Sequence, residues 1–435
     1  MASSTVPFSL IFFFFFLFIS SSIAQQSFRP KSLVLPVTKL QSSNQYITTF
    51  KQRTPLVPLN LTVDLGGRFL WVNCEDSYHS SSYKPVRCGS AQCSLANSKS
   101  CSYCPGKPRP GCNNNTCALF PDNPFGPITT IGDVGSDVIS LQSTNGKNPG
   151  QSVLAPKILF VCGANLLLEK LDGGVKGMVG LGRGKMGLPS QLASTFSFNR
   201  KFAICLGSQN GVIFFGNGPF TFLPNLEISS RSSLIYTPLL FNPVSTAGSY
   251  FQGEPSAEYF IGVKAIKING KNVPINTTLL AIDKQGNGGT KISTVQAYTM
   301  LQTSIYEAVS DAFSKALEQV PRVKPVAPFK VCFNSSFLGS TRVGPGVPQI
   351  DLVLQNKSVV WRIFGSNSMV NVGDDKLCLG FVDGGLEPRT SIVIGGHQIE
   401  DNYLEFDLAA SRLGFTSSLL FRQTNCGNFN FTSNV

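Results

Sequence analysis

The chain has 435 residues, of which 42% are hydrophobic and only 14% are charged. This length exceeds what a single hydrophobic core usually serves, and the composition excludes an intrinsically disordered protein and a coiled coil. The net charge of +12 comes from 36 basic and 24 acidic residues, with no Lys/Arg run longer than two. The basic tails of nucleic-acid-binding proteins are therefore excluded, and we expect two domains and no nucleic-acid partner.

The first 24 residues have the pattern of a secretory signal peptide. The apolar run from Phe8 to Ile19 is as long as a signal-peptide core and shorter than the ~20 residues that span a bilayer. Ser22-Ile23-Ala24 places small residues at the cleavage positions, so we expect the mature chain to begin at Gln25. Later segments show no membrane span, anchor or retention signal. We therefore expect a secreted, extracellular protein without a membrane partner.

Twelve cysteines lie in the expected mature chain, and an even number in an oxidising compartment predicts six disulfides whose pairing stays open. Cys101-x-x-Cys104 has the spacing of a zinc-ligand pair, but neither of the two histidines lies at ligand spacing from it. We therefore expect no metal and no other cofactor. A disulfide is expected for each of Cys74, Cys88, Cys93, Cys101, Cys104, Cys112, Cys117, Cys162, Cys205, Cys332, Cys378 and Cys426.

Six Asn-x-Ser/Thr sequons are candidate N-glycosylation sites on the surface of a secreted protein. The sequon at Asn60 lies inside a strand-like run, which predicts poor accessibility. The six are Asn60, Asn114, Asn276, Asn334, Asn356 and Asn430.

Short apolar segments typical of strands dominate the chain and favour an all-β fold. Leu59, Leu61 and Val63 alternate with polar residues, and Asn269-Gly270 between two strand-like segments predicts a hairpin. Further apolar runs predict strands over 158–161, 212–215 and 391–394.

One amphipathic helix is predicted over Ser304–Val320, because apolar residues recur there at helical spacing. Ser304 and Glu307 have the spacing of a capping box at its start. The Pro-, Ser- and Asn-rich sequence over 216–256 is typical of a connection. We therefore expect an N-terminal lobe over 25–225 and a C-terminal lobe over 226–435.

The two halves look like a diverged repeat. In the first half, the segment 61–66 (LTVDLG) is followed later by 178–182 (MVGLG). In the second half, 289–294 (GTKIST) is followed later by 393–396 (VIGG). Each half thus has a strand that ends in a small polar loop and a later apolar pair with glycine.

This arrangement resembles the pepsin-like aspartic proteases over essentially the whole mature chain. In that family each half supplies an Asp-Thr/Ser-Gly loop, and the two carboxylates share one proton. The resemblance implies an all-β, disulfide-rich pepsin-like fold, with two β-barrel-like lobes around a cleft.

The positions that match the catalytic loops depart from the family pattern. The first loop reads Asp64-Leu65-Gly66-Gly67, in which Leu65 and Gly67 replace the residues that would supply buttressing hydroxyls. At the second loop Ser293 stands where the second aspartate is expected, and no Tyr lies between 117 and 133, where such proteases cover the cleft. Because the two carboxylates work as a unit, we expect no protease activity and only vestigial roles for Asp64 and Ser293.

Longer motifs narrow the resemblance to one plant group. The segments 68–74, 177–184, 188–192, 405–409 and 412–415 are similar to basic 7S globulins, the extracellular dermal glycoprotein and xyloglucan-specific endoglucanase inhibitor proteins. The resemblance implies a defence protein of the apoplast and cell wall. Its implied partners are microbial endo-β-glucanases and xyloglucanases of glycoside hydrolase family 12, which it would inhibit.

The same resemblance implies two inhibitory loops in the C-terminal half. They match Phe333–Val347, which carries Arg342, and Ser417–Asn425, which carries Arg422. A guanidinium is always charged and matches carboxylates with a planar fork of donors, and a retaining glycosidase exposes two carboxylates ~5–5.5 Å apart. Related xylanase inhibitors use a histidine near the last loop, which this chain lacks, so a xylanase target is disfavoured.

Two other functions stay open. A storage globulin or a binder of a peptide hormone would need no active site and would leave every endoglucanase uninhibited. A residual peptidase that acts through Asp64 alone would require pepstatin-sensitive cleavage at acid pH. A serine-nucleophile reading of Ser293 is disfavoured, because His79 and His397 lie in unrelated segments.

Overall fold

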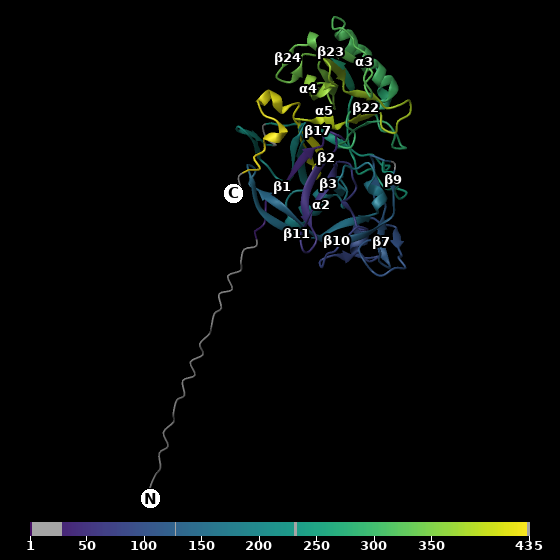
Figure 1. Ribbon diagram of the computed structural model, residues 1–435, viewed down its shortest axis with the longest axis vertical. Coiled ribbons are helices and arrows are strands. Elements are labelled where there is room, and N and C mark those ends of the chain that lie inside the picture. Colours follow the sequence, from purple (N-terminus) through teal and green to yellow (C-terminus); the bar gives the residue numbers. More distant parts are fainter. Residues whose placement is uncertain (2–27, 127, 230–232, 433–435) are drawn as a thin grey trace.

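The computed structural model describes residues 1, 28–126, 128–229 and 233–432. Apart from Met1, the expected signal peptide therefore lies outside the described residues. In Figure 1 the N-terminal half, coloured purple to teal, forms the lower part of the molecule, and α3 and β22–β24 of the C-terminal half lie in the upper part. No helix in the described part of the chain is long and apolar enough to cross a membrane.

The predicted all-β fold is confirmed, because most described elements are strands, and 20 of these strands form one large sheet. Its strands are β1 (Ser32–Lys39), β2 (Tyr46–Gln52), β3 (Val57–Asp64), β4 (Trp71–Asn73), β5 (Lys84–Pro85), β6 (Ser100–Ser102), β7 (Thr116–Leu119), β10 (Gly132–Thr144), β11 (Pro149–Gly163), β12 (Val175–Gly180), β13 (Lys201–Cys205), β14 (Asn210–Gly216), β17 (Ile235–Leu240), β18 (Tyr259–Ile261), β21 (Thr290–Ile292), β22 (Thr299–Leu301), β30 (Phe381–Asp383), β31 (Ile392–Ile394), β32 (Tyr403–Asp407) and β33 (Arg412–Phe415).

Smaller sheets and short helices decorate this sheet. Three small sheets have two strands each: β8 (Asp122–Asn123) with β9 (Ile128–Thr129), β15 (Phe220–Phe222) with β16 (Leu226–Ile228), and β24 (Ser340–Thr341) with β25 (Gly344–Pro345). A four-stranded sheet contains β19 (Ala265–Ile268), β20 (Lys271–Asn272), β26 (Ile350–Val353) and β27 (Val360–Ile363). A three-stranded sheet contains β23 (Cys332–Asn334), β28 (Met369–Asn371) and β29 (Lys376–Leu379). The helices are α1 (Ala91–Leu95), α2 (Leu188–Phe196), α3 (Thr303–Ala316), α4 (Gly365–Ser368), α5 (Gly396–Ile399), η1 (Asn165–Leu168), η2 (Thr277–Leu280), η3 (Ser335–Phe337), η4 (Leu419–Arg422) and η5 (Cys426–Asn428).

The predicted internal repeat is present as two parallel strand pairs. In the first half β3 runs parallel to β12, with Asp64 opposite Gly180. In the second half β21 runs parallel to β31, with Ile292 opposite Ile394. Each pair places the loop that follows its first strand beside a glycine-containing segment, and this local geometry positions the central site.

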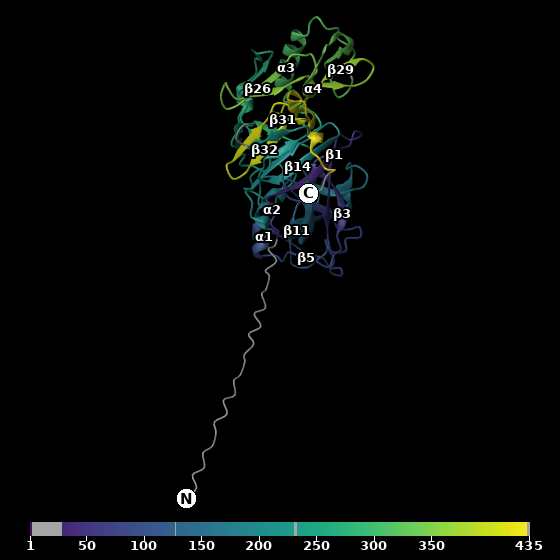
Figure 2. The ribbon, with the colours of Figure 1, turned by 90° about the vertical axis from the view of Figure 1, so that its left-hand side faces the viewer.

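A continuous sheet and core join the halves. Strand β13 pairs antiparallel with β32 from the far end of the chain, and Figure 2 shows β32 and β14 in the middle of the molecule, between α3 and β5. One hydrophobic cluster contains buried residues from both halves, among them Leu33, Trp361 and Phe415. The proposed lobe boundary between residues 225 and 226 falls in the turn between β15 and β16 and stays a prediction.

Six disulfides pair all twelve cysteines, as the sequence predicts. Three of them close the loops between β5 and β7, and one joins the residue after β4 to β11. One joins β23 to β29, and one joins β13 to η5 near the chain end. Cys101 and Cys104 belong to different disulfides, so they do not form a ligand pair. The bonds are Cys74–Cys162, Cys88–Cys101, Cys93–Cys117, Cys104–Cys112, Cys205–Cys426 and Cys332–Cys378.

The predicted hairpin at Asn269-Gly270 is confirmed, because β19 and β20 pair across these two residues and both have positive φ. The predicted helix is present as α3, but its capping box is wrong. The N-cap is Gln302, whose side-chain oxygen accepts from the backbone N–H groups of Ser304 and Ile305. Ser304 therefore lies inside the helix.

The predicted connection over 216–256 is wrong in part, because it contains β15, β16 and β17. Strand β17 pairs with β33 and β18, so this sequence builds part of the main sheet. Polar and Pro-rich composition did not reveal these strands, because β17 alternates exposed and buried residues around Pro238.

Candidate functional site

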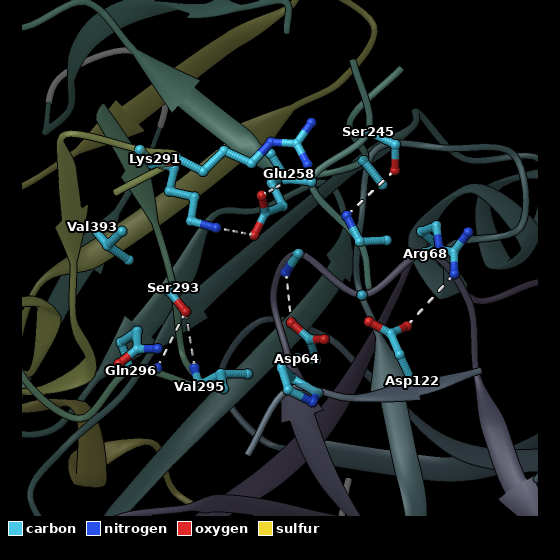
Figure 3. A pocket seen from close by; sticks show the side chains of 18 of the residues that line it. Asp64, Arg68, Asp122, Ser245, Glu258, Lys291, Ser293, Val295, Gln296 and Val393 are labelled. Carbon is cyan, nitrogen blue, oxygen red and sulfur yellow. Dashed lines mark hydrogen bonds and ion pairs between the residues drawn. The ribbon is translucent and has the colours of Figure 1, made fainter. Parts of the chain in front are cut away.

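A pocket of about 260 Å³ lies where the loops after β3 and β21 meet. Figure 3 shows Asp64 and Asp122 on one side, and Lys291, Ser293 and Val295 on the other. The two matching loops of the repeat are thus brought together, as the resemblance implies.

Asp64 is held at the end of β3 by the backbone around it. Its carbonyl accepts from the Leu181 N–H at 2.9 Å, and its carboxylate oxygen Oδ1 accepts from the Gly66 N–H at 3.0 Å. Burial, and secondly the nearby carboxylates of Asp122 and Glu258, raise the pKa of Asp64 to about 7. Below neutral pH this carboxyl is therefore largely protonated.

Ser293 faces the same pocket but bonds within its own loop. Its Oγ accepts from the backbone N–H groups of Val295 and Gln296, at 3.2 Å each, and Figure 3 draws both bonds. Among the described residues, no hydrogen bond joins the Ser293 hydroxyl to Asp64. An oxygen that accepts two backbone donors caps a turn, which gives Ser293 a local structural role.

Thr294 keeps a buttressing contact between the loops that the sequence analysis did not assign. Its Oγ1 donates to the Val63 carbonyl at 2.8 Å and accepts from the Leu65 N–H at 3.0 Å. The contact is not reciprocal, because the side chain of Leu65 has no hydroxyl that could form the equivalent hydrogen bonds to the loop that contains Thr294. The sequence feature that could have predicted this contact is the threonine at the middle position of the second loop.

Glu258 is a second feature of the site that sequence reasoning missed. Its carboxylate lies 2.7 Å from the Lys291 ammonium, and Figure 3 shows this ion pair beside the loop that follows Asp64. A Cβ atom on Gly66 would come within 2.7 Å of Glu258 Cγ. Glycine at position 66 therefore allows Glu258 to lie over this loop in the position that the structure shows.

A segment of residues 242–257, which we call the cleft strap, precedes Glu258 and contacts the N-terminal half. The Glu254 carboxylate lies 3.2 Å from the Arg68 guanidinium. The Phe251 ring packs on Phe120 with centroids 5.3 Å apart. The strap therefore crosses to the side of the pocket formed by the N-terminal half.

The cleft strap also contacts the C-terminal half. The Arg389 guanidinium lies 5.7 Å from the centroid of the Tyr250 ring, and Thr246 donates a hydrogen bond to Glu258. Ser245, Thr246 and Ala247 line the pocket. The strap thus contacts both sides of the pocket and forms part of the wall of the pocket that holds Asp64.

Arg342 lies exposed at the tip of the β24–β25 hairpin. The Thr341 hydroxyl donates to the Gly344 carbonyl at 2.7 Å and accepts from the Val343 N–H at 3.2 Å, which fixes the turn. Gly344 has φ +94°, and a Cβ there would come within 2.2 Å of the Ser366 backbone nitrogen. Only glycine permits this close approach.

Arg422 is the last residue of η4 and is also exposed. Gln423, at φ +58°, ends this helical turn in the left-handed conformation. The Phe421 ring contacts Phe364 with centroids 4.8 Å apart. Buried Leu419 anchors the other end of the turn in the core.

The two arginine-bearing loops flank one short segment of the chain. The Ser366 N–H donates to the Val343 carbonyl, beside Arg342, at 2.7 Å, and Phe364 contacts Phe421, beside Arg422. The structure therefore brings together two loops far apart in the sequence. Neither guanidinium makes an ion pair or hydrogen bond with another described residue.

The remaining predicted site residues lie elsewhere. Asn60, Asn114, Asn276 and Asn356 are exposed, and Asn334 and Asn430 are half-buried. The predicted poor accessibility of Asn60 is wrong, because alternation along β3 turns its side chain outward.

The two histidines lie apart from the pocket. His79 is exposed, whereas His397 bonds through its Nε2 to the Met369 carbonyl at 3.0 Å. No group of three or more His, Cys, Asp and Glu side chains in the described part of the chain is arranged to hold a metal ion.

Comparison with family models identifies two matching regions. Residues 46–217 match the model described as xylanase inhibitor N-terminal, and residues 258–417 match the model described as xylanase inhibitor C-terminal. The cleft strap lies between the two matched regions, and both arginine loops begin within the second.

Related proteins cover nearly the whole chain. It is 62% identical over 422 residues to "Probable aspartic proteinase GIP2" of Nicotiana benthamiana, with 96% of each chain covered. It is 46% identical over 442 residues to "Gamma conglutin 1" of Prunus dulcis, with 99% of this chain and 98% of that one covered.

Solved structures of similar proteins also match over nearly the whole chain. The crystal structure of edgp matches with a TM-score of 0.92 and 58% identity, and covers 94% of this chain and all of that one. The crystal structure of basic 7S globulin from soybean matches with a TM-score of 0.79 and 36% identity, covering 93% of this chain and 99% of that one. The chain therefore belongs to the family of basic 7S globulins, gamma conglutins and xylanase inhibitors, with their pepsin-like fold.

Proposed function

We propose that this chain is a secreted inhibitor of microbial cell-wall glycosidases, and that xyloglucan-specific endo-β-glucanases are its targets. The observation that carries the proposal is the placement of Arg342 and Arg422. Both are exposed, both lack an acidic partner among the described residues, and both flank the segment 364–366. The matches to xylanase inhibitor models support a glycosidase as the partner.

The inhibitory mechanism follows from the chemistry of the target. A retaining glycosidase has two carboxylates ~5–5.5 Å apart at the floor of an open cleft. Arg342 and Arg422 would enter this cleft and bind the carboxylates through charge-assisted hydrogen bonds. The +12 net charge of the chain would steer it toward an acidic cleft.

We also propose that the chain is not a protease. Asp64 has no carboxylate opposite it on the second loop, where Ser293 caps a turn. The Glu258–Lys291 ion pair and the cleft strap occupy space beside the Asp64 loop. A water activated between two carboxylates, on which aspartic proteases depend, has no second carboxylate at the matching position.

The test is an inhibition constant measured for the purified chain against a xyloglucan-specific endoglucanase. Arg342→Ala and Arg422→Ala should each raise this constant by roughly 30- to 5,000-fold, equivalent to ~2–5 kcal/mol for an unpaired buried charge. Arg109→Ala is the matched control, because Arg109 is exposed on a disulfide-closed loop of the N-terminal half. If both inhibitory-loop variants stay within about threefold of the unmodified chain, the proposed loops are wrong.

A storage or peptide-binding globulin is the second candidate, favoured by the gamma conglutin and basic 7S globulin relatives. Such a protein needs no free arginine pair. It would leave a panel of microbial endoglucanases and xylanases uninhibited, while peptide-hormone binding would be detected by calorimetry.

Secretion to the apoplast and glycosylation at the six sequons belong to both proposals, and mass spectrometry of the secreted chain tests glycosylation.

A further inference from the structure

A second pocket lies between the cleft strap and the N-terminal half, and it shares Arg68 and Ala257 with the pocket that holds Asp64. Its volume is about 440 Å³, which is within the ~300–1,000 Å³ typical of small-molecule sites. Buried Leu119 and Met186 form part of its wall. Leu95 and Phe241, which also line it, are 41% and 59% exposed. Two large apolar side chains at this pocket are therefore open to water and could be covered by a ligand.

Arg183 and Lys185, two of the three cations that line this pocket, are not neutralised by carboxylates among the described residues. Arg183 donates to the Leu240 carbonyl at 2.8 Å and to the Ser411 hydroxyl at 3.3 Å, and it makes no ion pair with a described residue. Lys185 is exposed and likewise has no acidic partner in the described part of the chain. A partly buried guanidinium that bonds only to neutral oxygens retains unbalanced positive charge.

One carboxylate lines the pocket, and it is already engaged. Glu254 lies 3.2 Å from the Arg68 guanidinium, so it does not balance Arg183 or Lys185. The Arg183 guanidinium lies 5.9 Å from the centroid of the exposed Phe241 ring. Positive charge and open apolar surface therefore meet at the same rim of the pocket.

We propose that this pocket binds a small organic anion that joins one carboxylate to an apolar body, such as an aryl- or alkyl-carboxylic acid. The carboxylate binds Arg183 and Lys185 at the rim. The apolar body lies against Leu95, Met186 and Phe241 and removes their surface from water. This site differs from the arginine loops of the C-terminal half, so its occupancy does not depend on glycosidase inhibition.

The test uses calorimetry of the full mature chain with 4-phenylbutanoate and with the uncharged 4-phenylbutan-1-ol. The carboxylate can form charge-assisted hydrogen bonds that the alcohol cannot, so the acid should bind about tenfold or more tightly than the alcohol. Higher ionic strength should weaken binding of the acid and leave that of the alcohol unchanged. Butanoate, which lacks the ring, should bind more weakly than 4-phenylbutanoate because it buries less apolar surface.

Variants of the two cations locate the site. Arg183→Gln and Lys185→Gln should each raise the dissociation constant of 4-phenylbutanoate, by about tenfold and about threefold, and leave the alcohol unchanged. Arg183 also bonds to Leu240 and Ser411, so Arg183→Gln could fail to fold. In that case the dissociation constant of the Lys185→Gln variant alone tests the proposal. Lys107→Gln, at an exposed lysine on a disulfide-closed loop, is the control and should change nothing.

Three results would overturn the proposal. They are the absence of measurable binding of 4-phenylbutanoate, equal binding of acid and alcohol, and an unchanged dissociation constant in folded variants at both Arg183 and Lys185. Binding of the acid with the predicted pattern supports the site whether or not the chain inhibits a glycosidase.

Discussion

The Glu258 carboxylate lies 2.7 Å from the Lys291 ammonium and directly beside Gly66, in the loop that follows Asp64. The space beside this loop belongs to the pocket that Asp64 and Ser293 line. Here an internal ion pair takes up part of it, and the cleft strap that precedes Glu258 contacts both halves. The ion pair and the cleft strap therefore determine much of the surroundings of Asp64.

Ser293→Asp should not create a protease, although it adds a carboxylate to the loop that faces Asp64 across the pocket. The nearby carboxylate of Glu258 and its ion pair with Lys291 remain in place, and the cleft strap still lines the pocket. Hydrolysis of casein at acid pH, with and without pepstatin, measures this. Pepstatin-sensitive turnover by the variant would contradict the proposed obstruction, and the same turnover by the unmodified chain, abolished by Asp64→Asn, would establish the residual peptidase.

Asp64→Asn should stabilise the chain at pH 8 and have little effect at pH 4. The pKa of Asp64 is about 7 in the folded chain and 3.8 when unperturbed, so the folded state binds the extra proton between these values. The contribution of Asp64 to stability is therefore full below pH ~4 and is lost as pH rises through ~7.

The gain in the free energy of unfolding at pH 8 is at most about 4 kcal/mol, because each unit of difference between the folded and unperturbed pKa of Asp64 corresponds to ~1.4 kcal/mol. Urea unfolding at the two pH values measures it. Asp311→Asn, at an exposed position of α3, provides the control and should show no such pH dependence. Equal effects of Asp64→Asn at both pH values would mean that Asp64 titrates normally.

Thr294→Val should destabilise the chain by ~1–3 kcal/mol, because it leaves the Leu65 N–H and the Val63 carbonyl without their partner in a buried loop. The expected fall in the free energy of unfolding is measured by urea or thermal denaturation. Thr277→Val, at an exposed position, should cost less than about 0.5 kcal/mol. A similar small loss at Thr294 would show that the two loops do not depend on this contact.

Local sequence patterns predicted the elements that local chemistry determines. Alternation along β3 and the Asn269-Gly270 turn are properties of a few neighbouring residues, and both are present in the structure. The start of α3 was misplaced because Gln302, which is not among the usual capping residues, fills the position with its side-chain oxygen.

Contacts across the chain could not be predicted in this way. Glu258 and Lys291 form a pair only because β18 and β21 are neighbours in the sheet, and the sequence gives no sign of their register. Arg342 and Arg422 were singled out through a family resemblance. That their loops flank the same segment, 364–366, depends on packing between residues distant in the sequence.

Arg342→Lys and Arg422→Lys should each weaken glycosidase inhibition, although both keep the positive charge. Lysine offers a compact ammonium in place of the planar fork that binds a carboxylate through two parallel hydrogen bonds. We expect each inhibition constant to rise by about tenfold, less than for the alanine variants. Inhibition assays of the four single variants measure this order. Full activity of both lysine variants would show that charge alone suffices and that bidentate contact is absent.

Glycosidase inhibition should weaken as pH falls through the pKa of the target's catalytic carboxylates, near ~4–5 if unperturbed. Arginine stays protonated throughout, so the titrating groups belong to the target, and binding favours their ionised form. A target carboxyl that is protonated when free should release its proton on binding, which calorimetry in buffers of different ionisation enthalpy detects. The double variant Arg342→Ala/Arg422→Ala should lose this proton release together with affinity. Inhibition that is independent of pH from 4 to 7, without proton exchange, would rule out direct contact between the arginines and the catalytic carboxylates.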